Sequence, residues 1–460
     1  MNKVVAKKVS ELVDVFNNIR IPLSSKQRET LAKIYPYYGA QGIVDYVDDY
    51  LFDGEYILIA EDGENLKSNN QNICNIVQGK FWVNNHAHIV RANAKNSTKY
   101  LFYNFNRIKF EPYVTGSSQP KLNKENLLNI KAYVHENLND QKSIAKVLSD
   151  LDTKIELNNR INRELEAMAK TLYDYWFVQF DFPFDFAQGK PNEQGEVAER
   201  SRSYKSSGGK MVYNAELKRE IPEGWEVGYI GNYCPSSGGF AFKSSWWSNE
   251  GISVVKIKDI QEDYTIDISN LAKVDLTDKK IDDKFKAKPG DILIAMTGAT
   301  VGKYGIVPIT DYPIYVNQRV GYFNLGKEPT EKLPYLINSL NQPYFREMIF
   351  SLASGAAQPN ISNEQINRIS LIIPDRTIVN KYNLKFAPFY KTILNNQRQN
   401  QQLTELRDWL LPMLMNGQVV STSSTSSDAS TTAPGSTSIL PVPELVEGMA
   451  AEPGGEYKKG

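Results

Sequence analysis

The stretch from Gln141 to Trp176 constrains the fold of this chain more than any other, because it contains neither proline nor glycine. Its apolar residues recur at alternating steps of four and three, which is the spacing of a coiled-coil seam. At 1.5 Å per residue such a helix is about 50 Å long, so it needs a partner along its side. Val147, Ile161 and Met168 are expected to widen the apolar stripe. The predicted seam residues are Ile144, Leu148, Leu151, Ile155, Asn158, Asn162, Leu165 and Leu172.

The same spacing returns near the end of the chain, between Phe386 and Leu414. The two stretches are related by one shift, because Ile155 corresponds to Ile393 and 393 − 155 = 238. A shared shift indicates a duplicated helix, and we expect the second copy to be the partner of the first. The predicted seam residues of this second helix are Phe389, Ile393, Asn396, Asn400, Leu403 and Leu410.

Asparagine stands at two equivalent seam positions of both stretches: Asn158 and Asn162 in the first, Asn396 and Asn400 in the second. A buried amide weakens a coiled coil but fixes its register and pairing. Alternatively, these side chains lie at the solvated margin of the stripe. The duplication holds under either interpretation.

The segments that precede the two helices are duplicated as well. The apolar run 57–60 returns at 292–295, shifted by 292 − 57 = 235. Val83 and the three residues after it return at Val316, shifted by 316 − 83 = 233. The loop GSSQPKL returns as GAAQPNI, shifted by 358 − 119 = 239. Because the shifts barely drift, we interpret the chain as one unit of roughly 200 residues that occurs twice.

This pattern predicts an α+β protein with pseudo-two-fold symmetry. Two similar mixed α/β domains are separated by two long helices, which pair as an antiparallel coiled coil. The first domain is predicted at 1–139 and the first helix at 140–180. A linker follows at 181–210 and contains a polar insertion at 186–203. The second domain is predicted at 211–376, the second helix at 377–418 and a disordered Ser/Thr/Pro-rich tail at 419–460.

Composition limits the class of protein. The 460 residues are 41% hydrophobic and 23% charged, which suits two or three globular domains. The formal net charge is zero, so any nucleic-acid site must be a local patch. Only Cys74 and Cys234 occur, and no apolar N-terminal run or membrane-length segment is present. We therefore expect a cytoplasmic protein without disulfides and without a membrane partner.

Several segments together are typical of a known family: YPYYGAQGIVDY, FDGEYILIAEDG, the GSSQPKL and GAAQPNI loops, the first long helix, SSGGKMVYNAELKREIPEGWEV and KPGDILIAMTGATVGK. Through them, over roughly residues 8–418, the chain resembles the specificity subunit of type I restriction-modification systems. Its insertion and tail are unlike that family, and the stretch before the first helix, AYVHENLND, lacks the expected prolines.

The resemblance implies a non-catalytic subunit whose two target-recognition domains each read half of a split site in double-stranded DNA. It implies that the helices dock methyltransferase subunits, expected to be two, and that restriction (translocase) subunits join them. S-adenosylmethionine, ATP and Mg are then expected on the partner subunits and no cofactor on this one. No Asn/Asp-Pro-Pro-aromatic motif and no glycine-rich S-adenosylmethionine loop occurs in the sequence.

Candidate DNA contacts lie in equivalent loops of the two domains. Gly116 and Gly355 permit a close backbone approach. Amide side chains suit adenine, arginine suits guanine, and lysines pair with phosphates. The alternatives are structural turns, hydrogen bonding at strand ends, surface lysines in solvent and tyrosines in the core. The candidates are Tyr37, Tyr38, Asn84, Asn85, His86, Ser117, Gln119, Lys121, Lys256, Lys258, Lys303, Asn317, Gln318, Arg319, Gln358 and Asn360.

Other chemistries are disfavoured. The segment Gly298–Lys303 is one residue short of a P-loop and lacks its Ser/Thr. His86 and His88 have no third ligand at metal-binding spacing, so no metal site is expected. Two rivals remain: a self-sufficient restriction or methyltransferase enzyme, and a coiled-coil scaffold with two domains that bind something other than DNA.

Overall fold

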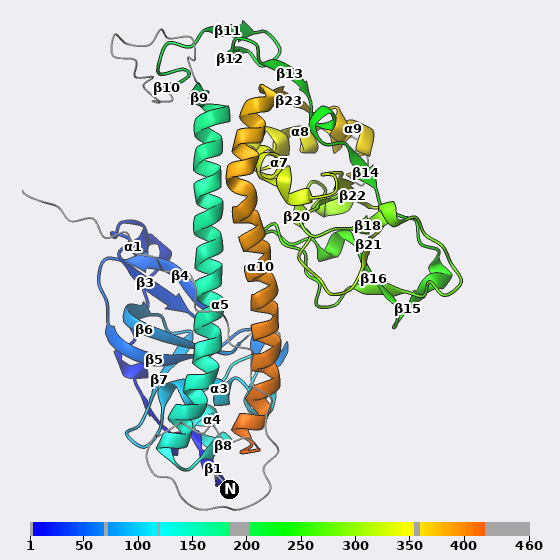
Figure 1. The fold of residues 1–460 in the computed structure, drawn as a ribbon. Helices are drawn as coiled ribbons and strands as arrows, with labels where there is room; N and C mark the ends of the chain where they lie inside the picture. Colours follow the sequence, from blue (N-terminus) through cyan, green and yellow to red (C-terminus); the bar gives the residue numbers. More distant parts are fainter. Residues whose placement is uncertain (1–2, 69–71, 117–119, 185–201, 354–358, 419–460) are drawn as a thin grey trace, which may run out of the picture. The chain divides into compact units, whose positions relative to one another are not determined.

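In the computed structural model, both predicted domains and both predicted long helices belong to the unit Met1–Ser421 (Figure 1). The predicted tail and most of the predicted insertion lie outside the described residues and stay predictions. Among the described helices, none has the length and hydrophobicity needed to cross a membrane. The structure describes residues 3–68, 72–116, 120–184, 202–353 and 359–418.

Two long helices, α5 (Leu138–Tyr173) and α10 (Arg376–Met415), lie side by side (Figure 1). Each begins at a side-chain cap: Asn137 accepts a hydrogen bond from a backbone N–H of α5, and Asp375 does so for α10. A π-helical turn, η4 (Asp174–Val178), continues α5. The predicted pair of long helices is confirmed.

The register of the pair is antiparallel. Asn158 Nδ2 donates to Asn400 Oδ1 over 2.8 Å, and Asn396 Nδ2 donates to Asn162 Oδ1 over 2.8 Å. The partner number falls as the first number rises, which confirms the predicted direction. Since 396 and 400 are the equivalents of 158 and 162, the two contacts are related by the pseudo-two-fold axis.

The seam asparagines of α5 are buried rather than at the solvated margin, and those of α10 are half-buried. Asn158 is 1% exposed and Asn162 is 8% exposed. Each buried amide therefore depends on a partner in the other helix, which favours one register. The remaining seam residues are buried or half-buried: Ile144, Leu148, Leu151, Ile155, Leu165, Leu172, Phe389, Ile393, Asn396, Asn400, Leu403 and Leu410.

Two of the three residues expected to widen the stripe are exposed. Ile161 is 36% exposed and Met168 is 55% exposed, so that expectation was wrong for both. One partner helix covers only a narrow stripe of α5. Val147 is half-buried against the first-domain core.

The first domain, from β1 to β8, is built on a six-stranded sheet of order β2-β7-β5-β6-β3-β4 (Figure 1). All neighbours are antiparallel except β3 and β6. A separate antiparallel pair joins β1 to β8. The strands are β1 (Val4–Lys8), β2 (Val13–Val15), β3 (Tyr35–Gly39), β4 (Gly42–Val47), β5 (Phe52–Ala60), β6 (Cys74–Val83), β7 (Ala87–Ala92) and β8 (Lys131–His135). The helices are η1 (Val9–Glu11), η2 (Asn17–Ile19), α1 (Ser25–Glu29), α2 (Asn65–Ser68), α3 (Thr98–Phe105), η3 (Glu111–Tyr113) and α4 (Lys124–Asn129).

The second domain, from β11 to β23, contains two main sheets, β14-β22-β19-β20 and β15-β17-β16-β21-β18. Two pairs accompany them, β11 with β12 and β13 with β23. The strands are β11 (Met211–Asn214), β12 (Arg219–Pro222), β13 (Glu226–Tyr229), β14 (Ser236–Gly238), β15 (Trp247–Ser248), β16 (Ile252–Val255), β17 (Ala272–Val274), β18 (Lys286–Ala287), β19 (Ile292–Ala295), β20 (Tyr304–Ile306), β21 (Ile314–Val316), β22 (Val320–Phe323) and β23 (Ser370–Ile373). The helices are α6 (Ile230–Tyr233), η5 (Ser244–Trp246), η6 (Ile257–Asp259), η7 (Asp283–Phe285), η8 (Gly298–Thr300), η9 (Pro329–Glu331), α7 (Leu333–Leu340), α8 (Pro343–Ala353) and α9 (Asn363–Asn367).

One long strand of the first domain is divided in the second. β6 pairs with β5 along most of its length and with β3 at its end. In the second domain β20 pairs with β19, and β21 pairs with β16 in parallel, as β6 does with β3. Pro308 and Pro313 lie between β20 and β21. Proline lacks the N–H that a central strand needs, so the sheet separates there.

Each domain packs against both helices. In the first domain, His135 Nε2 lies 2.9 Å from the carbonyl oxygen of Leu414, near the end of α10. The same core includes Ile144 and Leu148 from the start of α5. The first domain is therefore fixed to the beginning of one helix and the end of the other.

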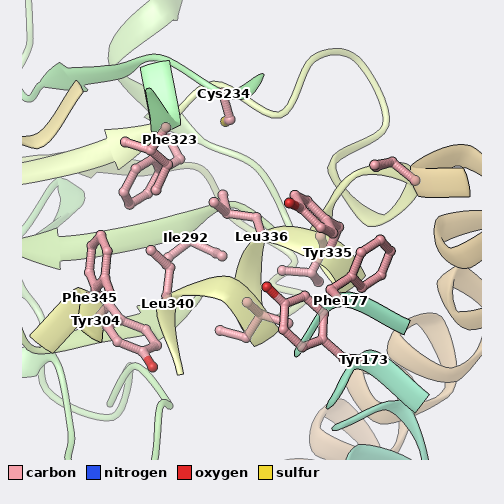
Figure 2. Close-up of a cluster of buried hydrophobic side chains, with 14 of the residues drawn as sticks. Tyr173, Phe177, Cys234, Ile292, Tyr304, Phe323, Tyr335, Leu336, Leu340 and Phe345 are labelled. Carbon is pink, nitrogen blue, oxygen red and sulfur yellow. The ribbon is translucent and has the colours of Figure 1, made fainter. Parts of the chain in front are cut away.

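The second domain makes the reciprocal arrangement. Tyr173, the last residue of α5, and Phe177 of η4 point into a core with Tyr335 and Leu336 of α7 (Figure 2). Tyr382 of α10 donates to the carbonyl oxygen of an α5 residue over 2.8 Å. The helices thus hold both domains through aromatic and aliphatic packing at their ends.

Both described ends of the segment predicted as a linker, 181–184 and 202–210, contain secondary structure and aromatic contacts, and its role as a linker stays a prediction. The strands β9 (Pro183–Phe184) and β10 (Arg202–Ser203) pair with each other. Phe182 stacks on Tyr204 and on Trp225, with ring centroids 4.7 and 4.9 Å apart. The sequence prediction followed the polar composition of the segment and did not include Phe182 and Tyr204, because Trp225, on which Phe182 stacks, lies outside the segment.

Candidate nucleic-acid interface

Three segments of the first domain meet at one edge of its sheet. Glu61 N–H donates to the carbonyl oxygen of His86 over 2.9 Å, and Leu122 N–H donates to that of Glu61 over 2.8 Å. Gly63 N–H donates to the carbonyl oxygen of Pro120 over 3.3 Å, and the φ of Gly63 is 120°. We call these segments the loop frame: 61–63, 84–86 and 120–122.

The second domain repeats the frame bond for bond. Met296 N–H donates to the carbonyl oxygen of Arg319 over 3.1 Å, and Ile361 N–H donates to that of Met296 over 3.0 Å. Gly298 N–H donates to the carbonyl oxygen of Pro359 over 2.9 Å, and the φ of Gly298 is 79°. The shifts found in the sequence therefore correspond to equivalent backbone positions.

Asn84 and Asn317 anchor their loops to the neighbouring strand. Asn84 N–H donates to the carbonyl oxygen of Tyr38 over 3.0 Å, and Asn317 N–H donates to that of Val255 over 3.1 Å. The side-chain oxygen of each accepts from the N–H two residues later, over 2.8 Å and 3.3 Å. The alternative of strand-end hydrogen bonding therefore holds for these two side chains.

The next two residues of each loop face solvent. Asn85 and His86 are exposed in the first domain, as are Gln318 and Arg319 in the second. The structure thus presents different side chains from two equivalent frames. These four residues remain candidate base contacts.

Charged residues surround the frame of the first domain. Glu61 accepts a 2.7 Å hydrogen bond from Arg20 and lies 3.3 Å from Lys121 Nζ. Burial alone would raise the pKa of Glu61, but the hydrogen bond from Arg20 and the neighbouring positive charges hold it below its usual value. His86 Nδ1 lies 2.6 Å from Asp62 Oδ2. The predicted contacts His86 and Lys121 are therefore each held by a carboxylate.

His88, which is buried, lies next to the loop frame and hydrogen-bonds to it. Asn17 Oδ1 accepts from Ile89 N–H, which orients the amide so that its Nδ2 donates to His88 Nδ1 over 2.8 Å. The other ring nitrogen therefore carries the hydrogen and donates to the carbonyl oxygen of Leu122 over 2.7 Å. Burial lowers the pKa of His88, so the ring is neutral. His88 joins two parts of the first domain and does not face solvent.

The frame of the second domain is almost free of charge. Arg319 is its exposed cation, at the position of His86. Residues without charge occupy the positions of Glu61, Asp62 and Lys121: Met296, Thr297 and Asn360.

The three predicted lysines of the second domain have partners. Lys256 follows β16, next to the frame, and its Nζ lies 3.5 Å from the ring centroid of Trp247. Lys258 Nζ lies 3.8 Å from Asp259, and Lys303 Nζ lies 2.9 Å from Glu262. To bind a DNA phosphate, Lys258 would have to leave Asp259 and Lys303 would have to leave Glu262.

The predicted tyrosines are mainly structural. Tyr37 is 2% exposed and its hydroxyl accepts from Leu23 N–H over 2.9 Å, so it is withdrawn as a DNA contact. Tyr38 is half-buried and packs edge-to-face on Phe81, with centroids 5.8 Å apart. Burial raises the pKa of Tyr38. A core role, the alternative from the sequence, fits Tyr37.

Three predicted contacts, Ser117, Gln119 and Gln358, lie outside the described residues and stay predictions. Sequence reasoning missed Arg20, Glu61 and Asp62. The two acids directly follow the duplicated strand run, so that comparison could have found them. Arg20 has no counterpart in the repeat. No three His, Cys, Asp or Glu side chains of the described segments gather as metal ligands.

Comparison with known proteins reveals two copies of one domain. A family profile described as the type I restriction modification DNA specificity domain matches residues 3–167 and 222–405. The type I restriction enzyme HindI specificity subunit of Haemophilus influenzae is 25% identical over 320 residues, covering 61% of this chain and 67% of its own length. The MjaVIII specificity subunit of Methanocaldococcus jannaschii is 25% identical over 408 residues, covering 85% and 87%.

A solved structure shares the fold. The crystal structure of a type I restriction-modification S subunit from M. genitalium aligns with a TM-score of 0.56 at 15% identity, covering 90% of this chain and 96% of the other. Each profile match covers most of one domain and most of the long helix that follows it. The family and the internal duplication are thereby established together.

Proposed function

The chain belongs to the type I restriction modification DNA specificity family, and on that premise we propose that it reads a double-stranded DNA target in two separate parts, one with each domain. The chain itself catalyses nothing. It supplies sequence specificity to partner subunits that methylate and cut DNA.

The observation that carries this proposal is the repeated loop frame. Its backbone hydrogen bonds are equivalent in the two domains, yet its outward side chains are Asn85 and His86 in one and Gln318 and Arg319 in the other. Amide side chains suit adenine and a guanidinium suits guanine in the major groove. Two frames of this kind would select two different short sequences.

The paired helices would set the gap between these sequences. The 36 residues of α5 extend about 54 Å, compared with about 34 Å for one turn of DNA. Buried asparagine pairs favour one register of α5 against α10, so they would favour one gap length.

The helices also offer surfaces for partners. We expect two methyltransferase subunits to dock there and restriction subunits to join them, with S-adenosylmethionine, ATP and Mg bound by these partners. Large apolar side chains are exposed on both helices, and such surfaces commonly mark interfaces. They are Leu157, Ile161 and Met168 on α5, and Leu384, Leu406 and Trp409 on α10.

Methylation mapping of cells that express the chain with its methyltransferase partner tests the proposal. We expect methylated adenines only within one split sequence, and none without this chain. Replacement of residues 211–376 by the second domain of another family member should change one half of that sequence. Change in both halves, or methylation of an unsplit site, would overturn it.

Two assays separate the rivals, one on the purified chain alone and one on its complex with the methyltransferase. Methylation or cleavage by the chain alone would indicate a self-sufficient enzyme. A complex with the methyltransferase that protects no DNA from footprinting reagents would indicate a scaffold.

A further inference from the structure

The first domain holds one exposed base-reading candidate in a defined hydrogen-bonding state. His86 Nδ1 lies 2.6 Å from Asp62 Oδ2. A carboxylate only accepts hydrogen bonds, so Nδ1 carries the hydrogen. In the neutral ring the other nitrogen, Nε2, is then an acceptor. The side chain of His86 is 50% exposed, compared with 19% for Asp62, so the histidine is the outer member of the pair.

The neighbouring cations pair with Glu61, whereas Asp62 pairs with His86. Glu61, the other acid of the frame, is engaged by Arg20 and Lys121. The backbone of Asp62 is itself fixed, because it forms a β-bridge with Lys121. Side chain and backbone together therefore give the histidine a rigid support.

Base edges in the major groove differ in what an acceptor can bind. Adenine and cytosine present an exocyclic amino group, whereas guanine presents the acceptors N7 and O6. An Nε2 acceptor therefore pairs with an amino group and faces repulsion at guanine. The second domain has the opposite chemistry at the same position, because the guanidinium of Arg319 can only donate.

We propose that His86 reads the exocyclic amino group of an adenine or cytosine in the half-site of the first domain, and that Asp62 is the positioning residue that fixes its ring and tautomer. This inference rests on the proposed function. Thr297, at the position of Asp62, lacks a carboxylate, so the second domain has no such pair.

Selection from a DNA library with one half-site randomised tests the pair. The full chain is used together with its methyltransferase partner. For the wild type we expect at least about tenfold preference for adenine or cytosine over guanine at one position of the first half-site. D62N permits either tautomer of His86, because an amide both donates and accepts, and should reduce that preference severalfold. The second half-site should stay unchanged.

Two further variants complete the design. D62T/H86R copies the second domain and should shift the preference at that position to guanine. T297A is the matched control in the other domain and should leave the first half-site unaltered. Guanine selected by the wild type, or an unchanged preference in D62N, would overturn the inference. Enrichment of no split sequence by the wild type would instead overturn the proposed function.

Discussion

The two domains share a backbone frame but differ in the sheet beneath it and in the charges upon it. The first has one continuous six-stranded sheet and a frame with Glu61, Asp62 and His86, whereas the second has two sheets and a frame whose exposed cation is Arg319. Backbone hydrogen bonds are kept while outward side chains differ. A duplicated module can therefore acquire a second specificity without a second architecture.

The largest expected effect is on stability, and it compares two buried clusters that differ in whether they include residues of the long helices. Phe81 and Phe323 are both fully buried, one in each domain. Phe323 belongs to a core cluster that includes residues of α5 and α10, whereas the cluster of Phe81 contains none from either helix. We expect F81A and F323A each to cost about 3–5 kcal/mol of unfolding free energy. Only F323A should also lower hydrogen-exchange protection in α5 and α10.

Exchange measured by mass spectrometry on both variants checks this difference. Y213A, at an exposed position, serves as the control for handling and should change neither region. Equal loss of helix protection in F81A and F323A would contradict the separation of the Phe81 cluster from the two helices.

A smaller effect is expected from making one frame like the other. E61M places the residue of the second domain in the first and leaves the partly buried Arg20 without its carboxylate. We expect a loss of about 2 kcal/mol, because a hydrogen bond to a charged group is removed. R20M/E61M removes both charges and should recover part of that loss. Chemical denaturation of the three proteins measures it, and a double variant no more stable than E61M would contradict the ion-pair explanation.

The symmetric asparagine contacts should cost less still. Asn158 donates to both Gln399 and Asn400, whereas Asn162 accepts one bond from Asn396. We expect N158A to cost about 1 kcal/mol and N162A less than that. Thermal denaturation of the two variants provides the comparison. A greater cost for N162A than for N158A would contradict the expectation that the cost follows the number of hydrogen bonds lost.

The smallest effect depends on pH and is confined to the first domain. Burial lowers the pKa of His88 below its unfolded value of about 6.5, so its contribution to stability is complete above that pH. That contribution is lost as the pH falls from about 6.5 through the folded pKa. Hydrogen exchange at pH 7.5 and 5.5 should show weakened protection of β7 but not of β22, where Gly321 replaces the histidine. Equal weakening of both strands would point to a general acid effect.

Periodicity and repetition made the helix pair predictable. The heptad spacing marks α5, and one shift carries Asn158 and Asn162 onto Asn396 and Asn400. Repetition also located the loop frame, because the residues around Asn84 recur around Asn317. These signals are local or duplicated, so a single sequence contains them.

Contacts between distant, unrepeated residues were not predictable. Arg20 pairs with Glu61, which lies 41 residues later in the sequence, and Phe182 of the predicted linker stacks on both Tyr204 and Trp225. Tyr37 was misassigned because a glycine two residues later suggested a loop, whereas its ring is enclosed in the core. Burial of this kind depends on tertiary packing, which sequence periodicity does not encode.

The central claim is that equivalent frames read different halves of one target. Site selection with H86A and with R319A, each in complex with the methyltransferase partner, tests it most directly. The account predicts that H86A relaxes base preference in one half-site only and that R319A relaxes it in the other half-site only. Relaxation of the same half-site by both variants, or of both half-sites by either one, would contradict it.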